Sequence, residues 1–209
     1  MKIMDYIEEY VNCIGIRMPI FTQEIYDYVF SKLPNVNKAV INEYIVRYAK
    51  QNPEFIRYQK GIYYKTTNTP FGQAGINLTE LIKKNYLFDS GKRIGYETGP
   101  SYMNKIGLTT QMPKFTFIAT ENKKSRPMES VYLIKPVTHI TEENFRYLQL
   151  LDMMENRVKV HFEVDRIKIF RDFIDRYELN YEQLLNFAKL YHNNKIYQEI
   201  AETTRGEFL

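Results

Sequence analysis

Apolar residues recur at helical spacing in three successive stretches near the start of the chain. These stretches are residues 2–14, residues 22–33 and about residues 36–51, and Asn52-Pro53 closes the last of them. An apolar residue at every third or fourth position gives a helix one face to bury against a core. Helices usually end at or before the residue that precedes a proline. We therefore predict three helices, with Thr22 as the N-cap of the second.

Two short runs rich in β-branched and aromatic residues come next, at residues 55–58 and 62–65. Lys60-Gly61 between them supplies the positive φ that a tight hairpin needs. Three helices followed by a hairpin with a basic tip is the order of a winged helix-turn-helix. Residues 1–68 are therefore predicted to form a winged-helix DNA-binding domain, with the polar segment 66–73 at its boundary.

The remainder of the chain, residues 69–209, is predicted to form a mixed α/β domain with a helical C-terminal part. Its clearest strands are residues 115–119 and 131–134, separated by a turn at residues 123–127. Its expected helices are residues 77–87, one capped by Thr141, residues 165–177, one that begins at Asn180, and residues 194–203. The predicted fold class of the whole chain is α+β.

Composition and charge narrow the class of protein. The chain has 209 residues, enough for one large or two small domains, and its single cysteine, Cys13, forms no internal disulfide. The first ten residues carry acids where a signal peptide has a basic start, and no stretch approaches the roughly 18 apolar residues of a membrane span. These features predict a soluble cytoplasmic protein that does not enter a membrane.

Positive charge is concentrated in the middle of the chain. Residues 31–65 hold 7 Lys and Arg against 2 Asp and Glu, whereas residues 1–30 hold 2 against 5. Residues 66–135 hold 10 against 5, and residues 136–209 hold 10 against 13. A local basic surface is what binding to phosphates requires, whatever the total charge. Charge alone fits a solvated surface equally well.

Candidate DNA-binding residues lie on the third helix and on the hairpin. If Ile41 and Ile45 face the core, Lys38 and Asn42 point outward, where Asn pairs with adenine and Lys reaches guanine or phosphate. Cations on a hairpin suit phosphate or minor-groove contacts. The alternative is that all of these are ordinary surface residues. The predicted DNA-binding residues are Asn35, Asn37, Lys38, Asn42, Arg57, Gln59 and Lys60.

Signals for catalysis are weak. The three histidines, His139, His161 and His192, lack metal-ligand spacing, and Gly99-Pro-Ser101 lacks the second glycine of a nucleophile elbow. The chain also has no phosphate-binding glycine loop. We therefore expect no catalytic residues, no metal and no cofactor. A weaker alternative is an enzyme, such as a nuclease, with a site near His139 or His161.

Two segments together resemble a known family. The hairpin segment Lys60-Gly-Ile-Tyr-Tyr64 is followed later by Ile106-Gly-Leu-Thr-Thr-Gln-Met-Pro113, which is preceded by the glycine-containing residues 95–104. This pairing resembles the AbiEi-type antitoxins of type IV toxin–antitoxin (abortive infection) systems and the closely similar DUF6088 proteins, over essentially the whole chain. One departure is that residues 102–106 read Tyr-Met-Asn-Lys-Ile, where the family usually has Ala-Leu-Asn.

The resemblance implies an N-terminal DNA-binding domain and a C-terminal mixed α/β domain that antitoxicity requires. It implies repression of the protein's own operon at inverted repeats in double-stranded DNA. It also implies opposition to a toxin of the nucleotidyltransferase fold, without a stable complex. The alternatives are a solitary winged-helix regulator without a toxin partner, and a module in which the winged helix and residues 77–135 bind other proteins.

Overall fold

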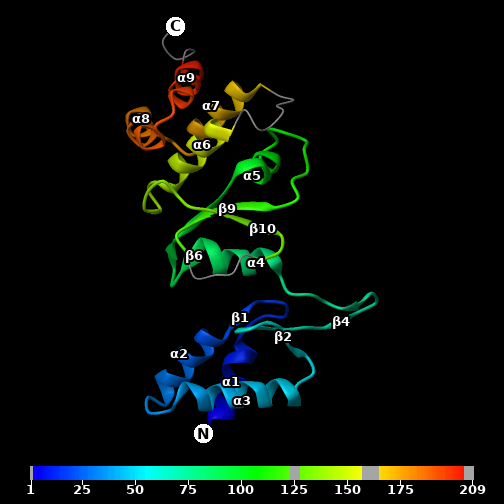
Figure 1. The fold of residues 1–209 in the computed structure, drawn as a ribbon. Helices are drawn as coiled ribbons and strands as arrows, with labels where there is room; N and C mark the ends of the chain where they lie inside the picture. Colours follow the sequence, from blue (N-terminus) through cyan, green and yellow to red (C-terminus); the bar gives the residue numbers. More distant parts are fainter. Residues whose placement is uncertain (1, 123–127, 157–164, 205–209) are drawn as a thin grey trace. The chain divides into compact units, whose positions relative to one another are not determined.

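The computed structural model describes residues 2–122, 128–156 and 165–204 (Figure 1). Helices and small sheets are both present, in agreement with the predicted α+β class. The chain divides into two compact units, residues 1–83 and 84–209. The turn predicted at residues 123–127 and the candidate residue His161 lie outside the described residues.

The first unit contains the three predicted helices and the predicted hairpin, together with a short strand that the sequence pattern did not indicate. Its elements are α1 (Ile3–Cys13), β1 (Ile20–Phe21), α2 (Thr22–Lys32), α3 (Lys38–Gln51), β2 (Phe55–Gln59), β3 (Ile62–Lys65), β4 (Asn68–Thr69), β5 (Gly72–Gln73) and α4 (Leu78–Ile82). The larger sheet has the antiparallel order β1-β3-β2, and β4 pairs with β5 in a separate hairpin.

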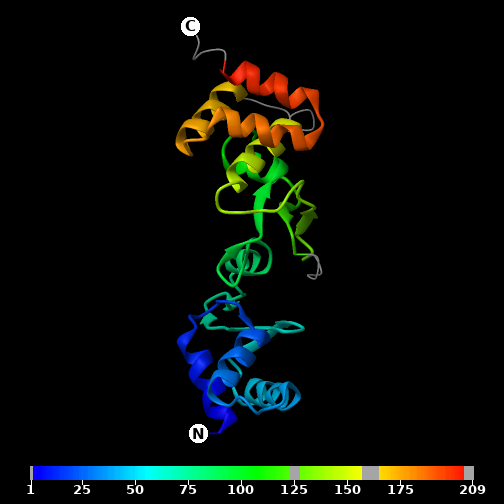
Figure 2. The ribbon, with the colours of Figure 1, turned by 90° about the vertical axis from the view of Figure 1, so that its left-hand side faces the viewer.

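The core of the first unit is built from the apolar stripes of its helices. Ile7 of α1, Ile25 of α2, and Ile41 and Ile45 of α3 are all fully buried, as their helical spacing predicts. Fully burying one such side chain contributes about 1.5–3 kcal/mol. Helix α1 contacts both α2 and α3, so the three helices share this core (Figures 1 and 2).

Aromatic contacts join this core to the sheet. The ring of Phe55 in β2 stacks on Tyr63 of β3, with ring centroids 4.9 Å apart. The same ring meets the edge of Tyr48 in α3 at 5.3 Å. Such pairs contribute about 0.5–1.5 kcal/mol beyond the area that they bury. Helix α3 and the β2–β3 hairpin are therefore held by one continuous set of buried rings.

The start of α2 differs from the prediction. Thr22 is the first helical residue and Phe21 is the N-cap, so the expected capping role of Thr22 is wrong. Phe21 donates its backbone N–H to the Glu24 carboxylate at 3.0 Å, which satisfies the helix start in place of a Thr hydroxyl. Thr22 instead donates its backbone N–H to the Gly61 carbonyl at 2.9 Å. This bond fixes the tip of the hairpin, where Gly61 has a φ of +82°, onto α2.

Residues after β3 remain tied to the first unit. The Thr66 hydroxyl donates to the Ala74 carbonyl at 2.7 Å, and the Arg17 guanidinium donates to the Gly75 carbonyl at 2.9 Å. Asn77 donates its backbone N–H to the Arg17 carbonyl at 2.8 Å. The division between the units thus falls at residues 83/84, whereas the sequence pattern places a boundary at residues 68/69.

The second unit combines a three-stranded sheet with a helical C-terminal part (Figure 1). Its elements are η1 (Lys83–Leu87), β6 (Phe88–Asp89), β7 (Lys92–Arg93), β8 (Gly95–Thr98), α5 (Gly99–Lys105), β9 (Thr116–Thr120), β10 (Val131–Ile134), α6 (Phe145–Asn156), α7 (Arg166–Arg176), α8 (Tyr181–Ala188), η3 (Lys189–Tyr191) and α9 (Asn194–Thr204). Strand β9 is antiparallel to β8 and parallel to β10. Residues 106–115 connect α5 to β9, so the segment that carries the family resemblance lies at a helix-to-strand junction.

A buried carboxylate links three elements of the second unit. Asp152 of α6 accepts hydrogen bonds from the hydroxyls of Tyr191 at 2.6 Å, Thr98 at 2.9 Å and Tyr96 at 3.1 Å. Burial raises the pKa of Asp152 to about 6, and the three hydrogen bonds act in the opposite direction. Helix α6, strand β8 and η3 are thus joined by one polar network beside the hydrophobic core.

Asp152 should make the stability of the second unit depend on pH. Its pKa is higher in the folded state than in the unfolded chain. Its protonated form therefore stabilises the fold fully below about pH 4, and this contribution is lost as the pH rises through about 6. The quantity to compare is the free energy of opening of α6 in the parent chain minus the same free energy in Asp152→Asn. We expect this difference to fall by on the order of 3 kcal/mol as the pH rises from about 4 to above 6. Native-state hydrogen exchange of the α6 amides measures this difference, and a difference that is constant with pH would contradict the assignment.

Candidate nucleic-acid interface

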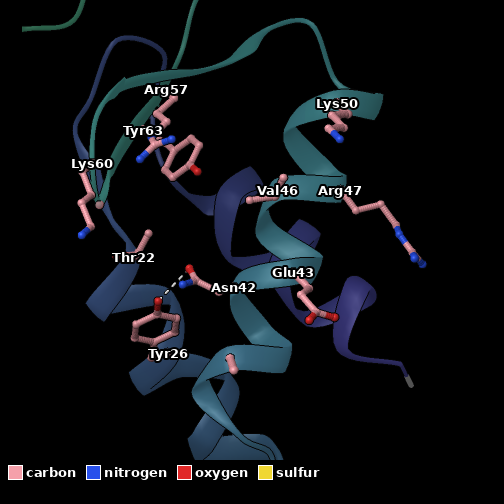
Figure 3. A pocket seen from close by; sticks show the side chains of 12 residues that line it. Thr22, Tyr26, Asn42, Glu43, Val46, Arg47, Lys50, Arg57, Lys60 and Tyr63 are labelled. Carbon is pink, nitrogen blue, oxygen red and sulfur yellow. Dashed lines mark hydrogen bonds between the residues drawn. The ribbon is translucent and has the colours of Figure 1, made fainter.

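A hollow of about 780 Å³ lies between α3 and the β2–β3 hairpin of the first unit (Figure 3). Its lining combines an exposed face of α3, the start of α2 and the inner side of the hairpin. The lining residues are Thr22, Tyr26, Ala39, Asn42, Glu43, Val46, Arg47, Lys50, Arg57, Lys60, Gly61 and Tyr63. We call this surface the α3–hairpin hollow.

Helix α3 uses opposite faces for the core and for the hollow. The residues that it contributes to the hollow are spaced by three or four positions, which places them in one stripe along the helix. They are Ala39, Asn42, Glu43, Val46, Arg47 and Lys50, all of which are exposed. Ile41, Ile45 and Tyr48 occupy the other face and are buried. Because one face of α3 is buried in the core, the residues on the opposite face are the ones exposed in the hollow.

The hollow is basic. Arg57 and Lys60 of the hairpin and Arg47 and Lys50 of α3 are among its lining residues, and Glu43 is the one carboxylate among them. In Figure 3 the Arg47 side chain extends from α3 away from the hairpin, and its guanidinium lies 5.5 Å from the centre of the Tyr44 ring. Within the described part of the chain, none of these four cations forms a salt bridge. Because the cations come from two elements on either side of one concavity, their fields add there. The surface is suited to an extended anion such as a nucleic-acid backbone.

A hydrogen bond between two helices orients one polar side chain in the hollow. The Tyr26 hydroxyl of α2 donates to the Asn42 side-chain oxygen of α3 at 2.8 Å (Figure 3). The Lys38 ammonium lies 5.4 Å from the centre of the Tyr26 ring and donates to the Gln23 side chain at 3.4 Å. Lys38 therefore lies back over α2 and is not part of the lining.

The structure brings three of the seven predicted DNA-binding residues together. Asn42, Arg57 and Lys60 line the α3–hairpin hollow. The other four are exposed but do not line it; they are Asn35, Asn37, Lys38 and Gln59. Asn37 is the N-cap of α3, and its side-chain oxygen accepts the Ala39 N–H at 2.8 Å. Its side chain thus has a structural function at the start of the helix.

Several lining residues were absent from the predicted set. Arg47 and Lys50 follow Glu43 at spacings of four and seven, so extending the exposed stripe of α3 beyond its first turns would have found them. Val46 lies on the same stripe and is 44% exposed. The sequence does not indicate that Tyr26 lines the hollow, because its place there depends on how α2 packs on α3.

The described candidate catalytic residues have structural partners. In the part of the chain that the structure describes, no three His, Cys, Asp or Glu side chains gather to hold a metal ion. His139 is exposed and pairs with Glu121 at 2.8 Å. The Ser101 hydroxyl accepts the Phe117 N–H and donates to the Thr98 carbonyl, so it braces the start of α5.

Among the described helices, none is long and apolar enough to cross a membrane. No protein-family model and no curated protein matches this chain at a significant level. Function is therefore inferred from the α3–hairpin hollow and from the sequence segments themselves.

Replacement of Asn37 separates its capping role from any contact with a ligand. Asn37→Ala removes the acceptor for the Ala39 N–H, and loss of an N-cap of this kind costs about 1 kcal/mol. We expect that decrease in the free energy of unfolding, measured by urea denaturation followed by helical circular dichroism. Asn35→Ala is the matched control, because this exposed asparagine precedes the helix and caps nothing in the described chain. Equal decreases in both variants would contradict the capping role.

Proposed function

We propose that the first unit is a winged helix-turn-helix that binds double-stranded DNA. The chain would then act in the cytoplasm as a transcriptional repressor without catalytic activity. The observation that carries this proposal is the basic α3–hairpin hollow, where cations from two elements, none of them in a salt bridge with a described residue, line a surface that includes the exposed face of one helix. Phosphate neutralisation by Lys and Arg supplies a large share of the affinity in such complexes.

The order of elements supports this proposal. Helices α2 and α3 are consecutive, β1 precedes α2, and the hairpin β2–β3 completes a sheet of order β1-β3-β2, as expected of a winged helix-turn-helix. In proteins of this type the second helix of the pair enters the major groove. Helix α3 would be that recognition helix, and the hairpin with Arg57 and Lys60 would be the wing that contacts the sugar–phosphate backbone.

The exposed face of α3 has the chemistry to distinguish bases. Asn42 offers amide hydrogen-bonding groups, Glu43 offers an acceptor for the amino group of cytosine, and Val46 offers methyl groups that suit the methyl of thymine. Arg47 and Lys50 continue this face toward the end of the helix, where they would reach phosphates. One helix face would thus provide both sequence discrimination and backbone affinity.

The antitoxin role rests on the resemblance described above. The proposal is that the chain represses its own operon at inverted repeats and opposes a toxin of the nucleotidyltransferase fold. The position of residues 106–113 between α5 and β9 supports it, because the resemblance places this segment at a helix-to-strand junction. A solitary regulator without a toxin partner remains the alternative.

A gel-shift titration against the DNA upstream of the protein's own gene tests DNA binding. The parent chain should bind this DNA in preference to a scrambled duplex of the same length. Lys60→Ala should weaken binding to both duplexes and reduce the slope of log affinity against log salt by about 1. Lys32→Ala is the matched control, because Lys32 lies at the end of α2 outside the hollow and its loss should leave the slope unchanged.

Two outcomes would overturn this function. Absence of a specific shift at moderate salt would exclude a sequence-specific repressor and would favour a protein-interaction module. Equal salt slopes for the parent chain, Lys60→Ala and Lys32→Ala would exclude the hairpin as a phosphate contact. Each outcome is read from the same titration series.

The antitoxin role has its own test. If the neighbouring gene encodes a nucleotidyltransferase-like protein, its expression alone should arrest growth, and co-expression of the chain from an unrelated promoter should restore growth. If the full chain carrying Lys60→Ala also restores growth, antitoxicity does not need tight DNA binding. Failure of the parent chain to restore growth would leave a DNA-binding regulator without this role.

A further inference from the structure

The hydrogen bond between Tyr26 and Asn42 has a consequence for which base the proposed DNA-binding surface selects. The Tyr26 hydroxyl donates to the Asn42 side-chain oxygen at 2.8 Å. Nδ2 of Asn42 makes no hydrogen bond to the residues that the structure describes, and Asn42 lines the α3–hairpin hollow. The amide is thus anchored through its acceptor, and its donors are left for a ligand (Figure 3).

This anchoring disfavours the usual pairing of asparagine with adenine. A bidentate pair uses the amide oxygen to accept from the N6 amino group of adenine and the amide nitrogen to donate to N7. Here Tyr26 occupies one of the two lone pairs of the oxygen and restrains the amide, so the oxygen is less available to the N6 amino group than the Nδ2 donors are to an acceptor. Guanine presents N7 and O6, which are both acceptors, on the same edge. An amide that presents mainly its N–H donors therefore matches guanine better than adenine.

Tyr26 is itself held in place. Its side chain is half-buried and packs against the core of the first unit. The Lys38 ammonium lies 5.4 Å from the ring centre, on a side chain that also bonds to Gln23 of α2. A cation over an aromatic face contributes about 0.5–1 kcal/mol at an exposed site. The ring is thereby restrained, and its hydroxyl donates to the Asn42 amide from a fixed position.

We propose that Tyr26 is a positioning residue that orients the Asn42 amide so that α3 selects guanine over adenine at one position of each half-site. This inference rests on the proposed DNA-binding function and adds a base preference to it. It also gives Tyr26 and Asn42 separate roles, because Asn42 touches the base whereas Tyr26 acts only through Asn42.

The test measures binding to every single-base variant of the operator for the parent chain and three variants. Asn42→Ala identifies the position that Asn42 reads, because discrimination is lost there. At that position the parent chain should prefer guanine to adenine by about tenfold. Tyr26→Phe frees the amide to rotate and should bring the ratio to about 1 or reverse it. Tyr28→Phe makes the same chemical change on α2 outside the hollow and should leave the ratio at the parent value.

The readouts separate a positioning role from a structural one. Tyr26→Phe should keep the salt slope and the discrimination at all other positions, whereas a variant with damaged packing would lose discrimination everywhere. A preference of the parent chain for adenine at this position overturns the inference, and so does an unchanged guanine-to-adenine ratio in Tyr26→Phe. In both cases the proposed function stands. If the parent chain selects no sequence at any position, the proposed function fails, and the inference fails with it.

Discussion

The contact of Phe55 with Tyr48 and Tyr63 is the interaction on which the candidate interface depends. It connects α3, β2 and β3 through buried rings, and so it sets how far the hairpin lies from the exposed face of the helix. The Gly61 carbonyl adds a second anchor at the tip of the hairpin through its bond to Thr22. Charged side chains on either side of the hollow can act together only because these apolar and backbone contacts fix their separation.

The charged groups discussed for the two units differ in exposure to water: those of the first unit are exposed, and that of the second is buried. In the first unit, Arg57 and Lys60 are exposed, so their hydration is lost only when an anion replaces it. In the second unit, the carboxylate of Asp152 is buried and depends on three hydroxyls to offset lost hydration. The first arrangement suits reversible binding to a polyanion. The second joins β8, α6 and η3 into one polar network.

Local periodicity predicted much of the first unit, because the helical stripes and the Lys60-Gly61 turn are encoded by neighbouring residues. The short strand β1 was missed, since two residues carry no recognisable alternation and pair with β3 only after the chain has folded. The capping role of Thr22 was wrong because the Glu24 side chain satisfies the start of α2. Each miss arose where a nonlocal or competing partner decided the local structure.

In the candidate site, too, local sequence predicted some features, whereas nonlocal contacts decided others. Asn42, Arg57 and Lys60 were predicted from their exposed positions, and the structure brings them into one hollow. Periodicity could not predict that Tyr26 would bond to Asn42, because that bond depends on the packing of α2 against α3. The bond engages the Asn42 oxygen, so the chemistry expected of Asn42 shifts from a bidentate pair toward donation through Nδ2. Residue type and exposure therefore predict the charge and polarity of a surface, whereas the orientation of its polar groups depends on contacts behind that surface.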